Sequence, residues 1–324
     1  MTKIEAAMLA AGLFMLAALL AKMDAAAALA SAAAVGPGFA LIFGQEIVAH
    51  ILNALGWKLA ITPGMSAKIK FRDILMMRIA GDGVNYLTPS ATLAGEWARA
   101  ALMGADHPLE QRLSSVALAK ITQTLAMAAV SAAGLALAAH SHAGLRALGP
   151  QLRNGGWLIG AIIVFIVFLE ARAGGKAQPQ TSGGTAGIWA KLKDVDATIM
   201  SFLRLYPARF MLSAGFFAAA YLWGAFEAYW ICRFLGMAVT VKTAILIEML
   251  AVLLDGIFFA VPGKAGTQEA TKTAIFAALG YPPSDGLAFG IVRHIREIAW
   301  AVCGFALYYF RRTKTAAAPS APPL

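Results

Sequence analysis

Long apolar blocks are the feature that most constrains how this chain folds. Inside a bilayer, no water satisfies backbone N–H and C=O groups, so an apolar block of about 20 residues must form a helix. Of the 324 residues, 60% are hydrophobic and only 14% are charged, whereas soluble domains carry about 25% charged residues. The sequence therefore predicts an all-α integral membrane protein with no soluble domain large enough for an enzyme. We expect about six spanning helices, at roughly 4–21, 39–57, 113–138, 156–170, 209–232 and 286–310.

The net charge of +10 is explained by a membrane location. Lys and Arg gather at the ends of the apolar blocks, and no nucleic-acid-binding motif accompanies them, so we expect no nucleic-acid partner. With the N-terminus in the cytoplasm, the predicted cytoplasmic segments hold 15 Lys and Arg and the outer segments hold five. This asymmetry predicts that both termini are cytoplasmic.

Two further apolar stretches, at about 74–103 and 245–280, are interrupted by Gly and Pro and carry charges. They match each other at a constant offset of 173 residues. The matched positions are Asp82 with Asp255, Gly83 with Gly256, Pro89 with Pro262, Glu96 with Glu269, Arg99 with Lys272, and Lys120 with Arg293. Charges are costly in apolar segments, so the match favours an internal duplication over a coincidence of turn residues.

Each matched stretch is expected to form a re-entrant hairpin. Pro89 and Pro262 end one half-helix, and Ser90 or Thr267 would cap the next. A broken helix at membrane depth is tolerated only where its free backbone groups are buried in protein or face a cavity. Three predicted spans separate the two stretches, so the hairpins enter from opposite sides, as in an inverted repeat. The predicted fold is therefore about six spanning helices plus two re-entrant helical hairpins in an inverted repeat.

The predicted organisation has four parts. The first repeat covers 1–138. Residues 139–208 hold a linking span, a Gly- and Ser-rich flexible loop at 173–187 and an interfacial amphipathic helix. The second repeat covers 209–312, and the Ala- and Pro-rich tail 313–324 is expected to be disordered.

Charged side chains within apolar segments are the candidate functional residues, because each costs at least about 2.5–3.5 kcal/mol unless it is paired or hydrated. Arg293 and Arg296 lie one turn apart on the last predicted span, a spacing that suits bidentate binding of phosphate or carboxylate. Helix N-termini after the two prolines would add positive dipole ends. Glu96 and Glu269 would balance these arginines or carry protons.

A polar cavity for a lipid head group is the resulting hypothesis. For any single residue the alternative is internal pairing, Arg293 with Glu297 and Glu96 with Arg99. The predicted cavity residues are Asp82, Asn85, Pro89, Glu96, Arg99, Lys120, Asp255, Pro262, Glu269, Arg293, Arg296 and Glu297.

No cofactor or metal site is predicted. His140 and His142 are too few ligands for a metal, and His50 and His107 have no obvious partners. The two cysteines lack metal-type spacing, and the chain has no Walker, dinucleotide-binding or nucleophile-elbow motif.

Three segments carry a family resemblance: Gly81–Pro89 with Gly95–Arg99, then Val261–Glu269, then Arg293–Trp300. In this order they resemble the flippase-like transmembrane region of lysylphosphatidylglycerol synthases, whose stand-alone members include hopanoid-biosynthesis-associated (HpnL-like) proteins. The resemblance covers nearly the whole chain and implies a lipid-handling protein of the bacterial inner membrane. In the synthases a separate soluble domain transfers the amino acid, so aminoacyl transfer is not expected of these residues.

The leading functional hypothesis is a lipid translocase or transporter built from two inverted repeats. The transported lipid could be an anionic phospholipid, a hopanoid or a polyprenyl phosphate, and the chain could also form a homo-oligomer. A lipid-modifying enzyme, with Glu96 and Glu269 as acid and base, is the first alternative. A non-catalytic scaffold for lipid-modifying partners is the second.

Overall fold

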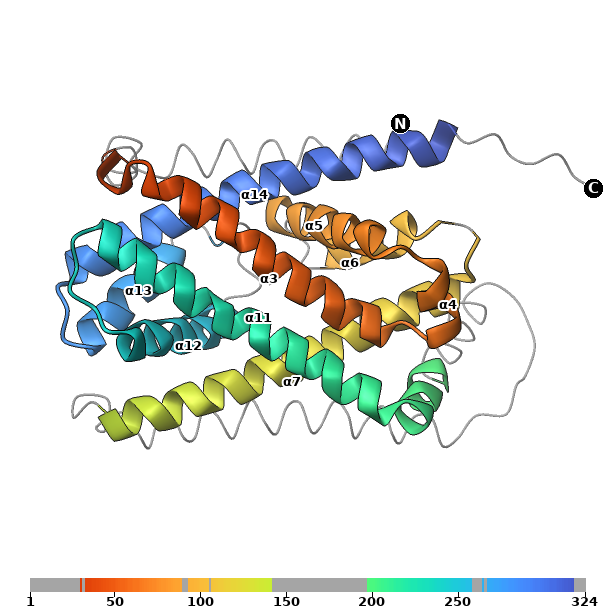
Figure 1. Ribbon diagram of the computed structural model, residues 1–324, viewed down its shortest axis with the longest axis horizontal. Helices are drawn as coiled ribbons and strands as arrows, with labels where there is room; N and C mark the ends of the chain where they lie inside the picture. Colours follow the sequence, from red (N-terminus) through yellow and green to blue (C-terminus); the bar gives the residue numbers. More distant parts are fainter. Residues whose placement is uncertain are drawn as a thin grey trace, which may run out of the picture.

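The computed structural model is built of long and short α-helices packed side by side (Figure 1). It describes residues 30, 33–88, 93–104, 106–141, 197–257, 264 and 267–317. No strand occurs among these residues, which confirms the all-α prediction for them. The helices are α3 (Gly38–Ala60), α4 (Pro63–Lys68), α5 (Phe71–Leu87), α6 (Leu93–Leu102), α7 (Leu109–Ser141), α11 (Pro207–Phe234), α12 (Val241–Ile257), α13 (Thr267–Ala278) and α14 (Pro283–Ala317).

Three of the described helices, α3, α7 and α11, are long and apolar enough to cross a membrane. They contain the predicted spans 39–57, 113–138 and 209–232, which are confirmed to that extent. The predicted span 286–310 lies inside α14 as part of one unbroken helix, whose charged residues make it more polar than the other three. The predicted spans 4–21 and 156–170 lie outside the described residues.

The helices form two copies of one four-helix unit, α3–α5–α6–α7 and α11–α12–α13–α14. Shifting a helix of the first copy by 173 positions gives a range that overlaps its counterpart. For example, α5 would fall on 244–260, and α12 covers Val241–Ile257. In Figure 1, α3 and α11 run in opposite directions, and so do α7 and α14. Corresponding helices are therefore antiparallel, as an inverted repeat requires.

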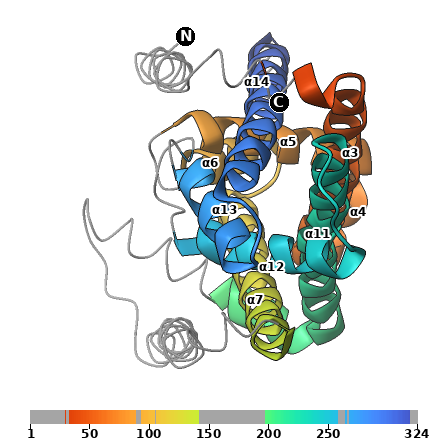
Figure 2. The same cartoon turned by 90° about the vertical axis from the view of Figure 1, so that its left-hand side faces the viewer.

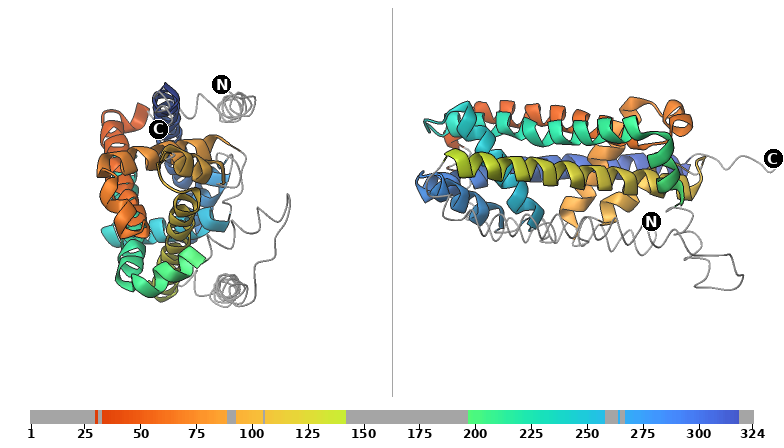
Figure 3. Two further views of the ribbon diagram at one scale, coloured as in Figure 1. Left: turned by 90° about the vertical axis from the view of Figure 1, so that its right-hand side faces the viewer. Right: turned by 90° about the horizontal axis from the view of Figure 1, so that it is seen from below.

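The short helices form two hairpins that start from opposite ends of the molecule. In Figure 1, α5 and α6 lie toward the right-hand end and α12 and α13 toward the left-hand end. Each hairpin packs against the long helices, α5 against α14 and α3, and α12 against α11 and α7 (Figure 3). The helices α3 and α11 lie side by side along one face (Figure 2). Their re-entrant placement in a bilayer stays a prediction.

Glycine allows the first hairpin to contact its neighbours at backbone distance. A Cβ on Gly95 of α6 would lie 2.1 Å from the carbonyl oxygen of Gly81 on α5. A Cβ on Gly83 of α5 would lie 2.7 Å from the carbonyl carbon of Gly304 on α14. These contacts leave no room for a side chain, so the seating of α5 depends on small residues, as in other membrane helix packings.

The described part of the predicted amphipathic helix packs on protein. Residues 197–205 are helical, and Ile199 and Phe202 are buried in an apolar cluster with Trp57 of α3 and Phe217 of α11. Residues 188–196 lie outside the described part of the chain. The interfacial position of this helix stays a prediction.

The expected disorder of the tail is wrong for residues 313–317, because α14 continues to Ala317. Lys and Ala have high helix propensity, and adding residues to an existing helix requires no new nucleation. Residues 318–324 and the expected loop at 173–187 lie outside the described residues.

Candidate functional site

Charged side chains join into two ion-pair networks, one at each hairpin. The first network connects α5, α6 and α7 and consists of Arg78, Asp82, Glu96, Arg99 and Lys120. The second network connects α12, α13 and α14 with α3 and α11 and consists of Glu46, Glu227, Glu248, Asp255, Lys264, Lys272, Arg293, Arg296 and Glu297.

Asp82 lies at the centre of the first network. Arg78 Nε, one helical turn earlier on α5, donates to Asp82 Oδ2 at 3.1 Å, and Arg99 of α6 pairs with Asp82 Oδ1. Arg99 Nη1 also donates to Glu96 Oε2 at 2.6 Å, so the predicted Glu96–Arg99 pair is confirmed. Lys120 Nζ of α7 lies 3.7 Å from Glu96 Oε1. The network therefore ties three helices together.

Asn85 joins the two helices of the first hairpin. Its Oδ1 accepts a hydrogen bond from the backbone N–H of Gly95 at 2.7 Å. Asn85 thus acts within the fold, and its predicted place in a head-group cavity stays a prediction. Pro89 and Pro262, which were also predicted as site residues, lie outside the described residues.

Asp255 in the second hairpin repeats the arrangement of Asp82. Lys272 Nζ of α13 donates to Asp255 Oδ1 at 2.5 Å, and Lys264 Nζ donates to Oδ2 at 3.1 Å. The Lys272 side chain is 0% exposed. Asp82 and Arg99 are 17 residues apart, and so are Asp255 and Lys272. The duplication seen in the sequence therefore extends to the contacts: the same acid–base pair closes both hairpins.

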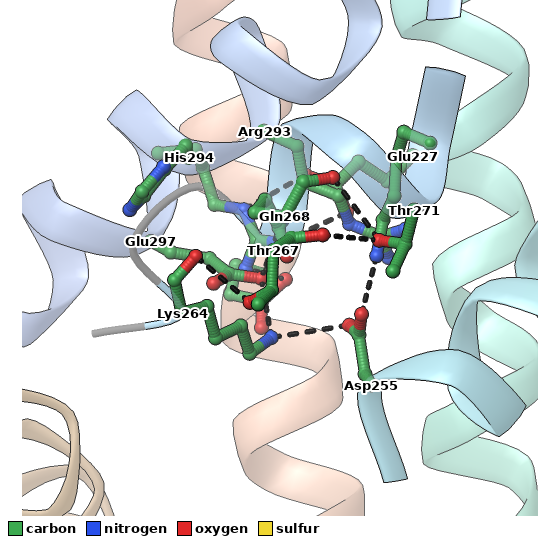
Figure 4. Close-up of polar contacts among 12 residues, drawn as sticks. Glu227, Asp255, Lys264, Thr267, Gln268, Thr271, Arg293, His294 and Glu297 are labelled. Carbon is green, nitrogen blue, oxygen red and sulfur yellow. Dashed lines mark hydrogen bonds and ion pairs between the residues drawn. The ribbon is translucent and has the colours of Figure 1, made fainter. Parts of the chain in front are cut away.

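Arg293 and Arg296 are held by carboxylates from neighbouring helices, and Figure 4 shows Arg293 with Glu227, one of these carboxylates. Arg296 Nε and Nη2 donate to the two oxygens of Glu227 on α11, at 2.7 and 2.9 Å. Arg293 Nε lies 3.2 Å from Glu227 Oε2, and Arg293 Nη2 lies 2.6 Å from Glu248 of α12. Glu46 of α3 contacts Arg296 Nη1 at 2.9 Å. In this conformation both guanidinium groups are paired within the protein.

Two expected pairings of the arginines are wrong. Glu96 and Glu269 do not balance them, because Glu96 belongs to the first network and Glu269 pairs with His294. Nor does Arg293 pair with Glu297 four residues later, because Glu297 accepts a hydrogen bond from Lys264 at 3.1 Å instead. The physical reason is that α11 and α12 present carboxylates to this part of α14, which local spacing along one helix cannot reveal.

The second network is incomplete in its hydrogen bonds. Arg293 Nε and Nη1 are buried and have no hydrogen-bond partner among the described residues. Glu297 Oε2 and Gln268 Oε1 are likewise buried without a donor, and these two side chains contact each other at 3.3 Å through Gln268 Nε2. An unmade buried hydrogen bond costs about 1–3 kcal/mol, and more for a charged group. The region therefore has unused capacity for a polar ligand.

Glu269 forms an ion pair with a histidine. Its Oε1 lies 2.5 Å from Nδ1 of His294, and no other ion-pair partner of Glu269 occurs among the described residues. The His294 side chain is 0% exposed and that of Glu269 is 16% exposed. The His294 ring also meets the ring of Tyr86 on α5 edge to face, with centroids 6.3 Å apart. This pair links α13 to α14.

Several residues of the two networks, and two histidines that contact their surroundings, were not predicted as site residues. Arg78 precedes Asp82 by four residues on a helix, a spacing at which opposite charges pair, so its role was readable from the sequence. His50 Nδ1 lies 3.7 Å from Asp82 Oδ2, so the expectation that His50 has no partner is wrong. The remaining additions come from tertiary contacts: Glu46, Glu227, Glu248, Lys264, Lys272 and His294.

Comparison with known families covers the whole candidate site. A family model described as "Lysylphosphatidylglycerol synthase TM region" matches residues 5–303, a range that contains both hairpins and both networks. No curated protein and no solved structure matches the chain. Among the described residues, no group of three or more His, Cys, Asp or Glu is arranged to hold a metal ion.

Proposed function

We propose that this chain, which belongs to the family of lysylphosphatidylglycerol synthase transmembrane regions, moves a membrane lipid between the two leaflets of the bilayer. The family links it to lipid modification or transport at the membrane. Of these two activities, the proposed one is transport, and the protein would bind the polar or anionic head group of the lipid.

The unsatisfied hydrogen-bond donors of Arg293 carry this proposal. Among the described residues, buried Arg293 Nη1 has no acceptor, and Arg293 Nε lies 3.2 Å from Glu227 Oε2 without hydrogen-bond geometry, beside Arg296, whose own donors are held by Glu227 and Glu46. Guanidinium groups bind phosphate and carboxylate oxygens with short, charge-assisted hydrogen bonds. A head group with such oxygens would complete the network, and it would compete with Glu227 for both arginines.

The inverted repeat supports movement as well as binding. Transporters with inverted repeats hold their substrates near the bilayer midplane, between discontinuous helices, and alternate their access by rocking one repeat against the other. Here each hairpin is closed by its own Asp–base pair. A head group would pass between the hairpins while the lipid tails stay in the hydrocarbon. In this proposal the charged residues bind and orient the head group, and none acts as a catalyst or holds a cofactor.

The proposed setting is the bacterial inner membrane, with both termini cytoplasmic, because Lys and Arg dominate the predicted cytoplasmic segments. The partner is a membrane lipid. Anionic phospholipids and polyprenyl phosphates offer the phosphate that the arginines suit, whereas a hopanoid would have to bind through its polar substituents.

A leaflet-access assay tests the function directly. Purified protein is reconstituted into liposomes with fluorescent anionic or neutral lipids, and movement is followed by quenching of the outer leaflet. Wild type should move one lipid class, and Arg296→Ala should abolish that movement. Arg233→Ala, at the exposed end of α11, is the matched control and should behave as wild type.

Two results would contradict the proposal. Folded wild-type protein that moves no lipid would refute translocation. If a new lipid species appeared in vesicles that contain protein and lipid alone, the protein would instead be a lipid-modifying enzyme.

A further inference from the structure

The buried and half-buried carboxylates of the described helices are not held alike. Every carboxylate of the two networks pairs with at least one Lys or Arg, whose charge is fixed near neutral pH. Glu269 differs, because His294 is its only ion-pair partner among the described residues. Histidine is the one side chain that ordinarily changes its charge between pH 5 and 8.

The repeat itself provides an internal comparison. Glu96 occupies the position that corresponds to Glu269, 173 residues earlier. It is held by Arg99 at 2.6 Å and by Lys120 at 3.7 Å, and neither partner is an imidazole. Glu269 has only a titratable partner, and its Oε2 atom is buried without a hydrogen bond. The two copies therefore share an acid and differ in whether its partner can lose a proton.

We propose that Glu269 and His294 form a proton-binding site that couples lipid movement to the proton gradient; the coupling rests on the proposed function, whereas the proton site does not. With His294 neutral, the pair carries one negative charge, and Nδ1–H donates to the Glu269 carboxylate. Uptake of one proton from water makes the pair neutral overall. Release of that proton to water restores the negative charge.

The helices packed against α13 and α14 bring one further imidazole, that of His50, which lies 3.7 Å from Asp82. The acids brought by the helices packed against α13 and α14 are all paired with Lys or Arg, and the Tyr86 phenol is of a type that ionises only near pH 10. The charged and titratable groups of the networks on these elements, with His50 and Tyr86, are Glu46 and His50 of α3, Arg78, Asp82 and Tyr86 of α5, Glu96 and Arg99 of α6, Glu227 of α11, Glu248 and Asp255 of α12, Lys264, Lys272 of α13, and Arg293, Arg296 and Glu297 of α14.

The location of Glu269 and His294 on two different helices means that a change in the charge of this pair affects how those helices are held together. Glu269 lies in the first turn of α13, in the second hairpin, and His294 lies on α14 between Arg293 and Arg296. Among the described residues, the pair is the one ion pair that joins α13 itself to α14, while Glu248 and Lys264 make further ion pairs between the second hairpin and α14. A change in its charge alters how firmly α13 is held against α14.

Nuclear magnetic resonance of protein labelled with ¹⁵N-histidine tests the site without any transport. The chain has five histidines, and the signal absent from His294→Gln identifies His294. In wild type this signal should change from neutral to protonated imidazole between about pH 8 and pH 5. Glu269→Gln should alter the pH response of that signal, because the variant removes the carboxylate that contacts His294 Nδ1. His107→Gln, in the loop before α7, is the matched control and should leave the His294 signal unchanged.

A single protonation state of His294 throughout that range would overturn the proton site. If His294→Gln does not fold, Glu269→Gln provides the second test, because this variant still contains His294. One histidine signal should respond to pH differently in Glu269→Gln than in wild type, and identical pH responses of all five histidine signals in the two proteins would overturn the proton site. The remaining histidines are then assigned by His107→Gln and by substitutions of the other three.

Liposomes with an imposed pH difference test the coupling. Wild type should move its lipid several-fold faster in one direction of the gradient than in the other, and His294→Gln should lose this directional difference. Wild-type movement that ignores the gradient would refute the coupling while leaving translocation intact. Absence of wild-type movement would overturn translocation and coupling together, and the ¹⁵N titration would still decide whether the pair binds a proton.

Discussion

The tie between Asp255 and Lys272 provides a quantitative test of how the second hairpin is held. Lys272→Met keeps the length and most of the volume of the side chain, and it removes a charge that is 0% exposed and 2.5 Å from Asp255. Removing one partner of a buried ion pair typically costs about 3–5 kcal/mol, because the other charge is left uncompensated. Asp255 keeps Lys264 at 3.1 Å, so we expect the lower end of that range, about 3 kcal/mol.

The free energy of unfolding can be measured in mixed micelles from intrinsic tryptophan fluorescence. Lys242→Met, at an exposed position in the first turn of α12, is the control and should change stability by less than about 0.5 kcal/mol. The double variant Asp255→Asn/Lys272→Met should recover most of the loss, because it leaves no lone buried charge at this pair. A loss below about 1 kcal/mol in Lys272→Met, or a double variant as unstable as the single one, would refute this reasoning.

Two further predictions concern how the helices are seated. Gly95→Ala should destabilise the protein by about 1–3 kcal/mol, because the new Cβ would lie 2.1 Å from the Gly81 carbonyl oxygen. Gly215→Ala is the control and should not destabilise the protein, because a Cβ there would meet nothing within 4 Å. Thermal unfolding of the two variants measures the difference. Arg209→Met should cost about 1–3 kcal/mol, because Arg209 donates to three carbonyl groups at the C-terminal end of α3. Arg204→Met, at an exposed position before α11, is its control, and equal stability of these two variants would contradict the capping role.

The sequence predicted what depends on patterns along the chain. Three apolar blocks became α3, α7 and α11 because their length and composition leave no other way to satisfy the backbone in a bilayer. The offset of 173 residues predicted that Asp82 and Asp255 occupy equivalent places, and both close a hairpin with a base 17 residues later. Pairs within one helix, such as Glu96 with Arg99, also follow from spacing alone.

Contacts between distant segments could not be predicted in the same way. Glu227 reaches Arg296 across 69 positions, and Arg209 reaches the end of α3 across about 150. Neither pair has a counterpart in the other repeat, so the duplication gave no signal for it. His294 was adjacent to two noted arginines, but only the packing of α13 on α14 shows that Glu269 is its partner.

The two copies of the repeat differ in the partner of one acid, and in the proposed mechanism this difference sets the direction of lipid movement. If both copies held their acid with fixed cations, opening either end of the inverted repeat would respond equally to pH. Here Glu96 is held by Arg99 and Lys120, while Glu269 is held by His294. Where one proton binds in one state and leaves in the other, a difference of one pH unit across the membrane biases the exchange by about 1.4 kcal/mol, a factor of ten. In the proposed mechanism, the histidine partner of Glu269 would let a proton gradient select the leaflet in which a head group is released, because Glu96, at the matching position of the other copy, has Arg99 and Lys120 instead.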